Sequence, residues 1–334
     1  MILTKYKLGE ILDVTRGASL SGEYYATEGE YIRLTCGNFD YQNNCFKENK
    51  SKDNLYYVGD FKSEFLMEEG DIITPLTEQA IGLLGSTAII PESGKYIQSQ
   101  DVAKIICKED LLDKDFAFYL ISSALVKQQL SAAAQQTKIR HTSPDKIKDC
   151  TVWIPELSEQ KRIGKLLRSI DRKIELNRAI NQNLEAMAKQ LYDYWFVQFD
   201  FPNEEGKPYK SSGGEMVWNE KLKRKIPNEW DNCKLKDFIN LFDSKRIPLS
   251  SKDREERKGN YPYYGATGIM DYVNEYIFDG DYILLAEDGS TSDSKGFPIV
   301  QYIWGKNWVN NHAHIILPKN EQYLMFTYQM LRSI

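Results

Sequence analysis

The sequence lacks long apolar runs, paired cysteines and a recognisable targeting segment. No apolar stretch approaches the length of a membrane span, and residues 1–5 (MILTK) do not begin a signal peptide, so we expect a cytoplasmic protein. The five cysteines are odd in number and form no CxxC pair. This pattern favours reduced thiols over disulfides or a zinc site.

The short motifs of common enzyme active sites are also missing. The chain has no GxxxxGK[ST] phosphate loop, no HExxH, no GxSxG and no methyl-transfer motif of the FxGxG type. We therefore predict a protein that is not an enzyme, with no catalytic residue and no metal of its own. Two alternatives stay open. Glu287 and Asp288 near Lys295, with Asp101 near Lys104, would suit a metal-dependent nuclease, although loop carboxylates are more often turn formers. His312 and His314 alternate on a predicted strand as a metal pair would.

The net charge of −5 argues against a protein that holds nucleic acid by bulk electrostatics alone. Local contacts remain possible, because basic residues gather in four segments, at 138–141, 161–173, 221–225 and 245–254. Each cluster can equally be a solvated face balanced by acids.

Residues 156–200 form one long amphipathic segment, for which we predict a helix with Ser158 as N-cap and Pro202 beyond its end. Apolar residues at alternating spacings of four and three predict a coiled-coil seam that needs a partner helix. Two central asparagines would fix its register. A buried hairpin in an ordinary core is the alternative. The seam residues are Ile163, Leu167, Ile170, Ile174, Asn177, Asn181, Leu184, Ala188, Leu191 and Trp195.

The segments before and after this helix resemble each other. Residues 70–73 (GDII) match 280–283 (GDYI), and 103–106 (AKII) match 313–316 (AHII), at one offset of 210. Self-similarity of this kind predicts a duplicated domain. The predicted elements are strands at 31–35, 71–75, 87–91, 102–107, 282–286, 298–304 and 313–317 and a helix at 115–133.

We therefore predict an α+β protein with two similar mixed α/β domains separated by a long coiled-coil-forming helix. The predicted boundaries are 1–155 for the first domain, 156–200 for the helix, 201–226 for a connector and 227–334 for the second domain. At the offset of 210, Ile334 corresponds to Ala124. We accordingly expect the second domain to be incomplete and the second helix to be missing.

Several segments resemble a known family, the specificity (S) subunits of type I restriction-modification systems. They are 154–163 (IPELSEQKRI), 192–214, 226–230 (IPNEW) and 262–268 (PYYGATG), and the resemblance covers essentially the whole chain. It implies two target-recognition domains that read a bipartite DNA site. It also implies methyltransferase (modification) and restriction subunits as partners, which would bring S-adenosylmethionine, ATP and Mg, so that this chain binds no cofactor itself.

Loops that differ between the two copies are the expected places of DNA contact, because a repeated scaffold places them equivalently while their side chains vary. A non-DNA scaffold whose coiled coil joins two interaction domains remains the alternative. The seam would be covered by a partner subunit, a second copy or a C-terminal fragment. The predicted DNA-binding residues are Thr77, Glu78, Gln79, Thr137, Lys138, Arg140, His141, Thr142, Tyr263, Tyr264, Glu287, Asp288 and Ser290.

Overall fold

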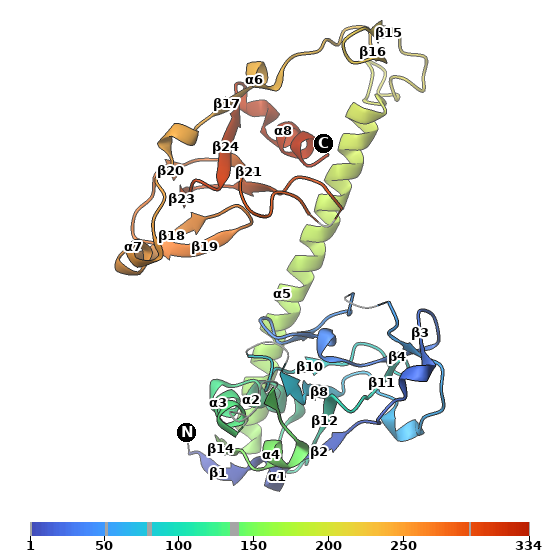
Figure 1. Ribbon diagram of the computed structural model, residues 1–334, viewed down its shortest axis with the longest axis vertical. Coiled ribbons are helices and arrows are strands. Elements are labelled where there is room, and N and C mark those ends of the chain that lie inside the picture. Colours follow the sequence, from blue (N-terminus) through green and yellow to red (C-terminus); the bar gives the residue numbers. More distant parts are fainter. Residues whose placement is uncertain (1, 51–52, 79–81, 134–139, 294, 334) are drawn as a thin grey trace. The chain divides into compact units, whose positions relative to one another are not determined.

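A computed structural model of the chain describes residues 2–50, 53–78, 82–133, 140–293 and 295–333. It divides into two compact units, residues 1–177 and 178–334, and each is described by itself. Both mix short strands with helices, as predicted (Figure 1). None of the helices within the described ranges is long and apolar enough to cross a membrane. The five cysteines are free thiols, as the sequence predicted.

The first unit is built on an antiparallel four-stranded sheet with the order β10-β8-β12-β2. Its strands are β2 (Leu12–Arg16), β8 (Ile72–Pro75), β10 (Ala88–Ile89) and β12 (Val102–Cys107). Helices α1 (Leu8–Ile11), α2 (Lys114–Ile121), α3 (Ala124–Ala133) and α4 (Pro144–Lys148) contribute side chains to the core cluster that contains Leu12, Ile72 and Ile105.

The predicted helix 115–133 is two helices, α2 and α3. The Ser122 hydroxyl donates to the carbonyls of Phe118 and Tyr119, and the Ser123 hydroxyl accepts from Val126 N–H. Serine side chains compete for backbone groups in this way, which explains the break.

A second sheet of the first unit has the order β11-β4-β7-β3, with β4 and β11 parallel. Its strands are β3 (Tyr25–Ala26), β4 (Tyr31–Arg33), β7 (Tyr56–Tyr57) and β11 (Tyr96–Ile97). Three two-stranded ladders complete the unit. They pair β1 (Thr4–Lys7) with β14 (Thr151–Ile154), β5 (Phe39–Asp40) with β6 (Cys45–Phe46), and β9 (Thr77–Glu78) with β13 (Arg140–His141).

The second unit repeats this plan. Its antiparallel sheet has the order β22-β21-β24-β17, and its other sheet, β19-β18-β23-β20, again contains a parallel pair, β18 with β23. The predicted strands 102–107 and 282–286 coincide with β12 and β21. The strands are β17 (Ile239–Leu241), β18 (Lys258–Tyr264), β19 (Ile269–Val273), β20 (Phe278–Asp279), β21 (Tyr282–Ala286), β22 (Val300–Ile303), β23 (Lys306–Val309) and β24 (Ala313–Pro318), and the helices are α6 (Leu235–Phe238), α7 (Ser251–Glu256) and α8 (Leu324–Leu331).

The offset of 210 is wrong by one residue within the antiparallel sheets. Val102 lies opposite Pro75 in the first unit, and Ala313 lies opposite Ala286 in the second, so both strands correspond at an offset of 211. Ile72 and Ile283 then share the core face that packs on α2 and α8. A slip of one residue moves every strand side chain to the opposite face, which is why sequence identity across a few residues could not fix the register.

Helix α5 (Leu157–Tyr192) ends in a π-helical turn at Asp193–Val197. It has 36 residues, which gives a length of about 54 Å at ~1.5 Å per residue. The predicted N-cap Ser158 is wrong, because the helix begins one residue earlier and the Ser158 hydroxyl donates to the Glu156 carboxylate. The first amides are satisfied by the Glu156 carbonyl, to which Glu159 and Gln160 donate.

Candidate nucleic-acid interface

The first unit joins two of the predicted recognition loops at one corner of its sheet. Strand β9 follows β8 directly and pairs with β13, so that Thr77 lies opposite His141 and Glu78 opposite Arg140. Thr142 N–H donates to the Leu76 carbonyl and closes the pair. The structure therefore brings the predicted 77–80 and 137–142 segments together where it describes them. Gln79, Thr137 and Lys138 lie outside the described residues.

Polar side chains meet at this first corner. The Thr77 hydroxyl lies 3.4 Å from Asp101 Oδ1, to which it donates, and 3.3 Å from His141 Nδ1. His141 is exposed, whereas Thr77 and Thr142 are buried. Thr142 Oγ1 has no hydrogen-bond partner among the described residues. A buried hydroxyl without a partner is costly, so this corner is a place where a ligand could supply one.

The second unit builds the same corner with different side chains. Glu287 N–H donates to the His312 carbonyl at 2.9 Å, just as Leu76 N–H donates to the Asp101 carbonyl at 2.8 Å. At the offset of 211, Thr77 and Asp101 correspond to Asp288 and His312, whose Oδ2 and Nδ1 atoms lie 3.3 Å apart. A Thr–Asp pair in one unit is thus an Asp–His pair in the other. Ser290 lies exposed in the same loop.

A carboxylate–histidine cluster lies beside this second corner. Asp243, Glu287 and His314 each offer one atom within 4.8 Å of the others, which is the spacing of metal ligands. The Arg246 guanidinium already lies among them, 2.6 Å from Glu287 Oε2 and 3.5 Å from Asp243 Oδ2, and it also donates to the Ala313 carbonyl at 2.9 Å. The residues present do not fit a divalent cation, because Arg246 supplies the positive charge that a metal would bring.

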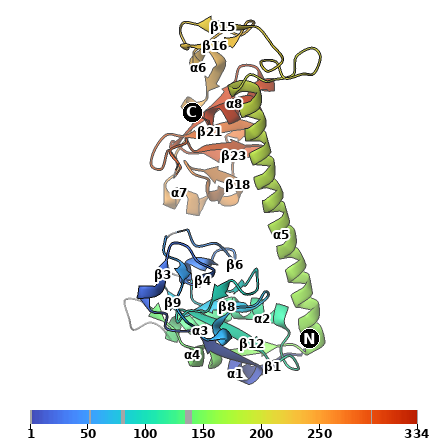
Figure 2. The same ribbon diagram turned by 90° about the vertical axis from the view of Figure 1, so that its right-hand side faces the viewer.

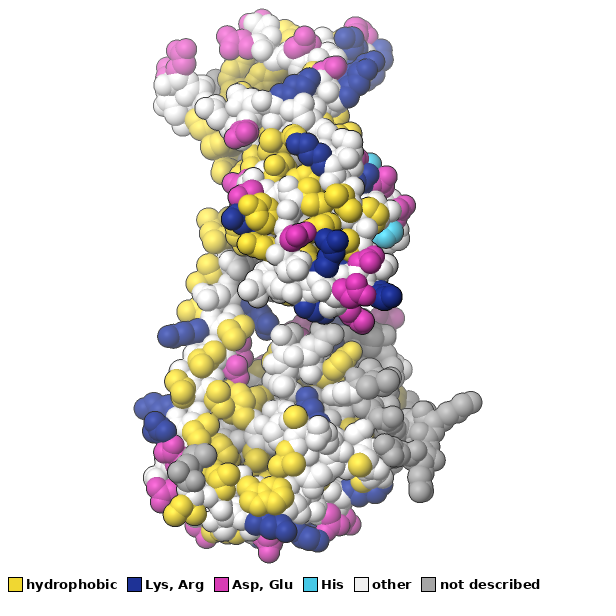
Figure 3. Space-filling view, turned by 90° about the vertical axis from the view of Figure 1, so that its left-hand side faces the viewer, with side chains coloured by type: hydrophobic (Ala, Val, Ile, Leu, Met, Phe, Trp, Pro, Cys, Tyr) yellow, Lys and Arg dark blue, Asp and Glu magenta, His cyan; other side chains and the backbone are white. Residues whose placement is uncertain are grey.

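The two histidines of the alternative metal pair belong to separate contacts. His312 pairs with Asp288, whereas His314 Nδ1 lies 2.5 Å from Asp243 Oδ2. Figure 3 shows histidine side chains of the second unit among acidic and basic ones. Asp243 and Arg246 were missed as site residues because only the fold brings them to the end of β21.

The two tyrosines predicted to bind DNA, Tyr263 and Tyr264, lie at the end of strand β18 and not in the corner loops. Tyr263 is 1% exposed, and its hydroxyl accepts from Leu249 N–H at 3.0 Å. Tyr263 therefore has no exposed surface with which to contact a base. Its hydroxyl instead fixes the backbone at Leu249. Tyr264 is half-buried against the core cluster that contains Leu284, and burial raises the pKa of its hydroxyl.

One face of helix α5 packs on the first unit (Figure 2). Gln160 is 1% exposed; its amide donates to the Leu111 and Pro155 carbonyls and accepts from Asp113 N–H at 3.0 Å. One turn on, a Cβ at Gly164 would stand 2.7 Å from the backbone nitrogen of Phe116.

Further along the same face, the Tyr119 hydroxyl donates to Asp171 at 2.5 Å. Burial, and then this carboxylate, raise the pKa of Tyr119. Arg168 packs over the Phe118 ring at 5.7 Å. Positions 160, 164, 168 and 171 recur at helical spacing, so the docked surface is a single stripe.

The predicted seam lies on another face of α5. Ile163 and Leu167 are half-buried, whereas Ile170, Ile174, Leu184 and Leu191 are between 42% and 56% exposed, and Asn177 and Asn181 are exposed as well. The predicted seam did not include four further apolar residues of α5 that are exposed. These are Leu166, Leu176, Ile180 and Met187.

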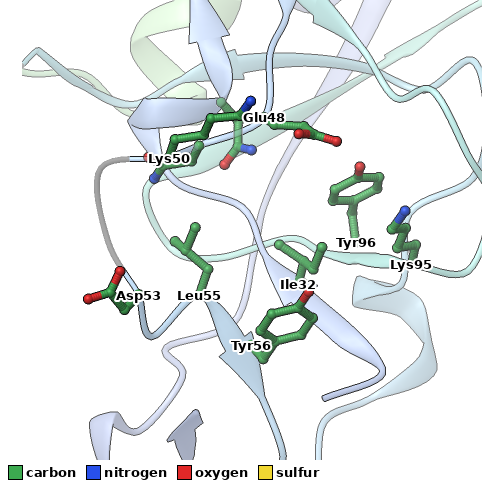
Figure 4. A pocket seen from close by; sticks show the side chains of 10 residues that line it. Ile32, Glu48, Lys50, Asp53, Leu55, Tyr56, Lys95 and Tyr96 are labelled. Carbon is green, nitrogen blue, oxygen red and sulfur yellow. The ribbon is translucent and has the colours of Figure 1, made fainter. Parts of the chain in front are cut away.

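The first unit also contains a cavity of about 300 Å³ beside its second sheet (Figure 4). Apolar and aromatic side chains from β4, β7 and β11 line one part of the cavity. Two lysines, two acids and two asparagines line most of the remainder. Its labelled lining residues are Ile32, Glu48, Lys50, Asp53, Leu55, Tyr56, Lys95 and Tyr96. No motif marks it in the sequence, because the lining is drawn from segments far apart in the chain.

Comparison with known proteins identifies the family. The family described as "Type I restriction modification DNA specificity domain" matches residues 3–186 and 227–334, which is most of the chain and covers both units. The chain therefore belongs to this family of type I specificity subunits, as its sequence suggested. The two matched segments also agree with the prediction of two similar domains.

Individual relatives match over shorter stretches. A putative type I restriction enzyme specificity subunit of Haemophilus influenzae is 38% identical over 115 residues, 34% of this chain and 28% of that protein. The MjaIX specificity subunit of Methanocaldococcus jannaschii is 24% identical over 150 residues, 45% of this chain and 32% of that protein. The matched stretches thus span about a third of these relatives. The crystal structure of a type I S subunit from M. genitalium shares the fold, with a TM-score of 0.57, 19% identity, and coverage of 98% of this chain and 76% of that one.

Proposed function

We propose that this chain recognises a bipartite DNA target in a sequence-specific manner and directs partner methyltransferase and restriction subunits to it. The observation that carries the proposal is the repeated corner. Each unit places a polar side-chain pair at the corresponding position of its antiparallel sheet. The pair is Thr77 and Asp101 in the first unit and Asp288 and His312 in the second. One scaffold with different donors and acceptors suits the reading of two different half-sites.

The proposed division of labour leaves the chemistry to the partners. Methylation and cleavage would be carried out by the methyltransferase and restriction subunits with their S-adenosylmethionine, ATP and Mg, and this chain would bind no cofactor. The geometry beside the second corner supports this view, because Arg246 occupies the cluster in which a nuclease metal would have to bind.

The test is the methylation pattern produced by the chain together with its methyltransferase partner. Replacing Asp288 by Asn should change base preference within one half-site, because a carboxylate only accepts hydrogen bonds whereas an amide also donates them. Arg140→Ala should alter the other half-site, or weaken binding uniformly if Arg140 contacts only phosphate.

Glu275→Gln is the matched control, since Glu275 is an exposed acid of the second unit that pairs with Arg257 away from the corner. A pattern left unchanged by both corner variants would remove these corners from the recognition surface. A chain that binds random and target duplexes equally would refute sequence-specific recognition.

The exposed seam of α5 is the proposed partner-helix site. A row of apolar residues that are about half exposed exceeds what soluble monomers ordinarily leave open. We expect a methyltransferase subunit, the helix of a second copy or a C-terminal fragment to cover it. Light scattering of the purified chain would detect the second copy, and a monodisperse monomer with α5 protected from hydrogen exchange would count against an open seam.

A further inference from the structure

Residues 216–227 form a β-hairpin, and all but the last of them lie between the two segments matched by the family, 3–186 and 227–334. Strand β15 (Met216–Asn219) pairs with β16 (Arg224–Pro227), and Trp218 lies opposite Lys225. The hairpin is anchored at its base, where Ile226 and Pro227 are buried. The proposed recognition function assigns this element no role.

The tip of the hairpin has a fixed conformation. Asn219 Oδ1 accepts hydrogen bonds from the N–H groups of Lys221 and Leu222, both at 3.0 Å. Lys223 adopts the left-handed backbone conformation, with a φ of 51°. Such side-chain-to-backbone bonds are characteristic of ordered turns. The side chains of this turn are therefore presented from a defined backbone.

The second strand of the hairpin is tied to the end of helix α5. The Arg224 guanidinium lies over the Phe199 ring at 4.7 Å and donates to the Val197 carbonyl at 3.1 Å. Next to it, Asp200 accepts from both the N–H and the hydroxyl of Ser211. These contacts fix the base of the hairpin in the second unit.

The hairpin carries a local excess of positive charge in a chain whose net charge is −5. Residues 216–227 contain four cations, at 221, 223, 224 and 225, against the single carboxylate of Glu220, which leaves a net charge of +3. Glu220 is already bonded to Lys223 and to the Trp218 indole, both at 2.9 Å. Among the described residues, Lys221 and Lys225 have no acidic partner and are exposed. Figure 3 shows Lys and Arg side chains gathered over this end of the second unit.

We propose that this hairpin binds the phosphate backbone of nucleic acid without regard to sequence. Clusters of lysine and arginine in a short segment are typical of nucleic-acid contacts, whereas lysine is depleted at the centres of protein interfaces. Lysine ammonium groups bind phosphates as point charges, and phosphate contacts carry no sequence information directly. An overall acidic chain needs such a local contact, because its bulk charge repels DNA.

This contact adds to the proposed recognition function and is separable from it. The corners would determine which sequence is bound, whereas Lys221 and Lys225 would contribute equally on every sequence. Loss of the hairpin contact should therefore lower the affinity for specific and random duplexes alike and leave base preference unchanged.

The experiment measures the binding of the whole chain to a random 30-base-pair duplex by fluorescence anisotropy over a series of salt concentrations. Each phosphate contact contributes about 0.9 to the slope of log affinity against log salt, so the double variant Lys221→Ser with Lys225→Ser should lower the slope by about 2. The control is Lys148→Ser with Lys207→Ser, which removes the same charge from lysines paired with Asp145 and Glu205. Circular dichroism should show both variants folded as the native chain is.

An unchanged slope in the hairpin variant, or an equal fall in the control, would overturn the proposal. If DNA binding were unchanged while binding to the methyltransferase subunit weakened, the hairpin would be a protein contact and the proposal would be wrong. If the native chain bound target and random duplexes equally, the proposed recognition function would be contradicted instead. The two failures are therefore distinguishable.

Discussion

Gln160 provides the sharpest test of how helix α5 is held on the first unit. Its buried amide makes three hydrogen bonds, to the carbonyls of Leu111 and Pro155 and from the backbone N–H of Asp113. Asp113 in turn caps helix α2, because its carboxylate accepts from Phe116 N–H at 2.9 Å. One side chain therefore fixes the start of α5 against the start of α2.

Replacing Gln160 by Ala would leave the buried carbonyl of Pro155, the half-buried carbonyl of Leu111 and the half-buried N–H of Asp113 without this partner. Each unsatisfied buried group costs about 1–3 kcal/mol before relaxation or water entry, so we expect the first unit to lose about 2–4 kcal/mol of stability. Gln160→Glu should not restore it, because a carboxylate can accept from Asp113 N–H but would face two carbonyl oxygens without a donor.

Hydrogen exchange with peptide-level resolution is the appropriate assay, since it reports the first unit separately from the second. Protection of the amides of α2 should fall in Gln160→Ala, and the second unit should be unaffected. Gln182→Ala is the matched control, because Gln182 is an exposed residue of the same helix. If the two variants exchanged alike, the buried amide would not be what attaches α5, and the docking argument would fail.

Three further predictions follow from other contacts. Arg246→Ala should destabilise the second unit by about 1–3 kcal/mol in a thermal or urea melt, because it leaves the partly exposed carboxylates of Asp243 and Glu287 without their cation. Arg246→Lys should recover only part of this loss; a native-like melt would refute the structural role. Hydrogen bonds from Ser211 lower the pKa of Asp200, so its contribution to stability is present above the ordinary aspartate pKa and is lost as pH falls through the lowered folded value. Asp200→Asn should then flatten the acid limb of a stability-versus-pH curve, and an unchanged limb would contradict this. Asn177→Leu should strengthen self-association through the α5 seam while loosening its register, which sedimentation and cross-linking can measure; weaker association would count against the seam.

The sequence predicted the architecture better than the details of any one element. Repeated apolar patterns such as GDII and GDYI were sufficient to predict two similar domains, because both copies bury the same strand. The alternating four- and three-residue spacing of apolar positions predicted α5. The register failed by one residue, since alignment of short matches has no access to which face of a strand is buried.

The sequence located the candidate corners only in part, and the reason is physical. Loop segments 77–80 and 287–292 could be located because they follow matching strands. Their partners could not, because Asp101, His312 and Arg246 come from distant parts of the chain and converge only when the sheet forms. A sequence pattern records spacing along the chain, whereas a binding site depends on proximity across it.

Under the proposed function, the two corners would let a duplicated scaffold serve a target whose two halves differ. The backbone contact is kept, with Leu76 N–H on the Asp101 carbonyl and Glu287 N–H on that of His312. That backbone contact requires no particular side chain at the next position, which is Thr77 in one unit and Asp288 in the other. Thr77 and Asp288 can therefore differ freely in what they donate and accept. Under the proposed function, backbone atoms would hold each corner while neighbouring side chains would set the target, so each unit could change its target while its sheet stays intact.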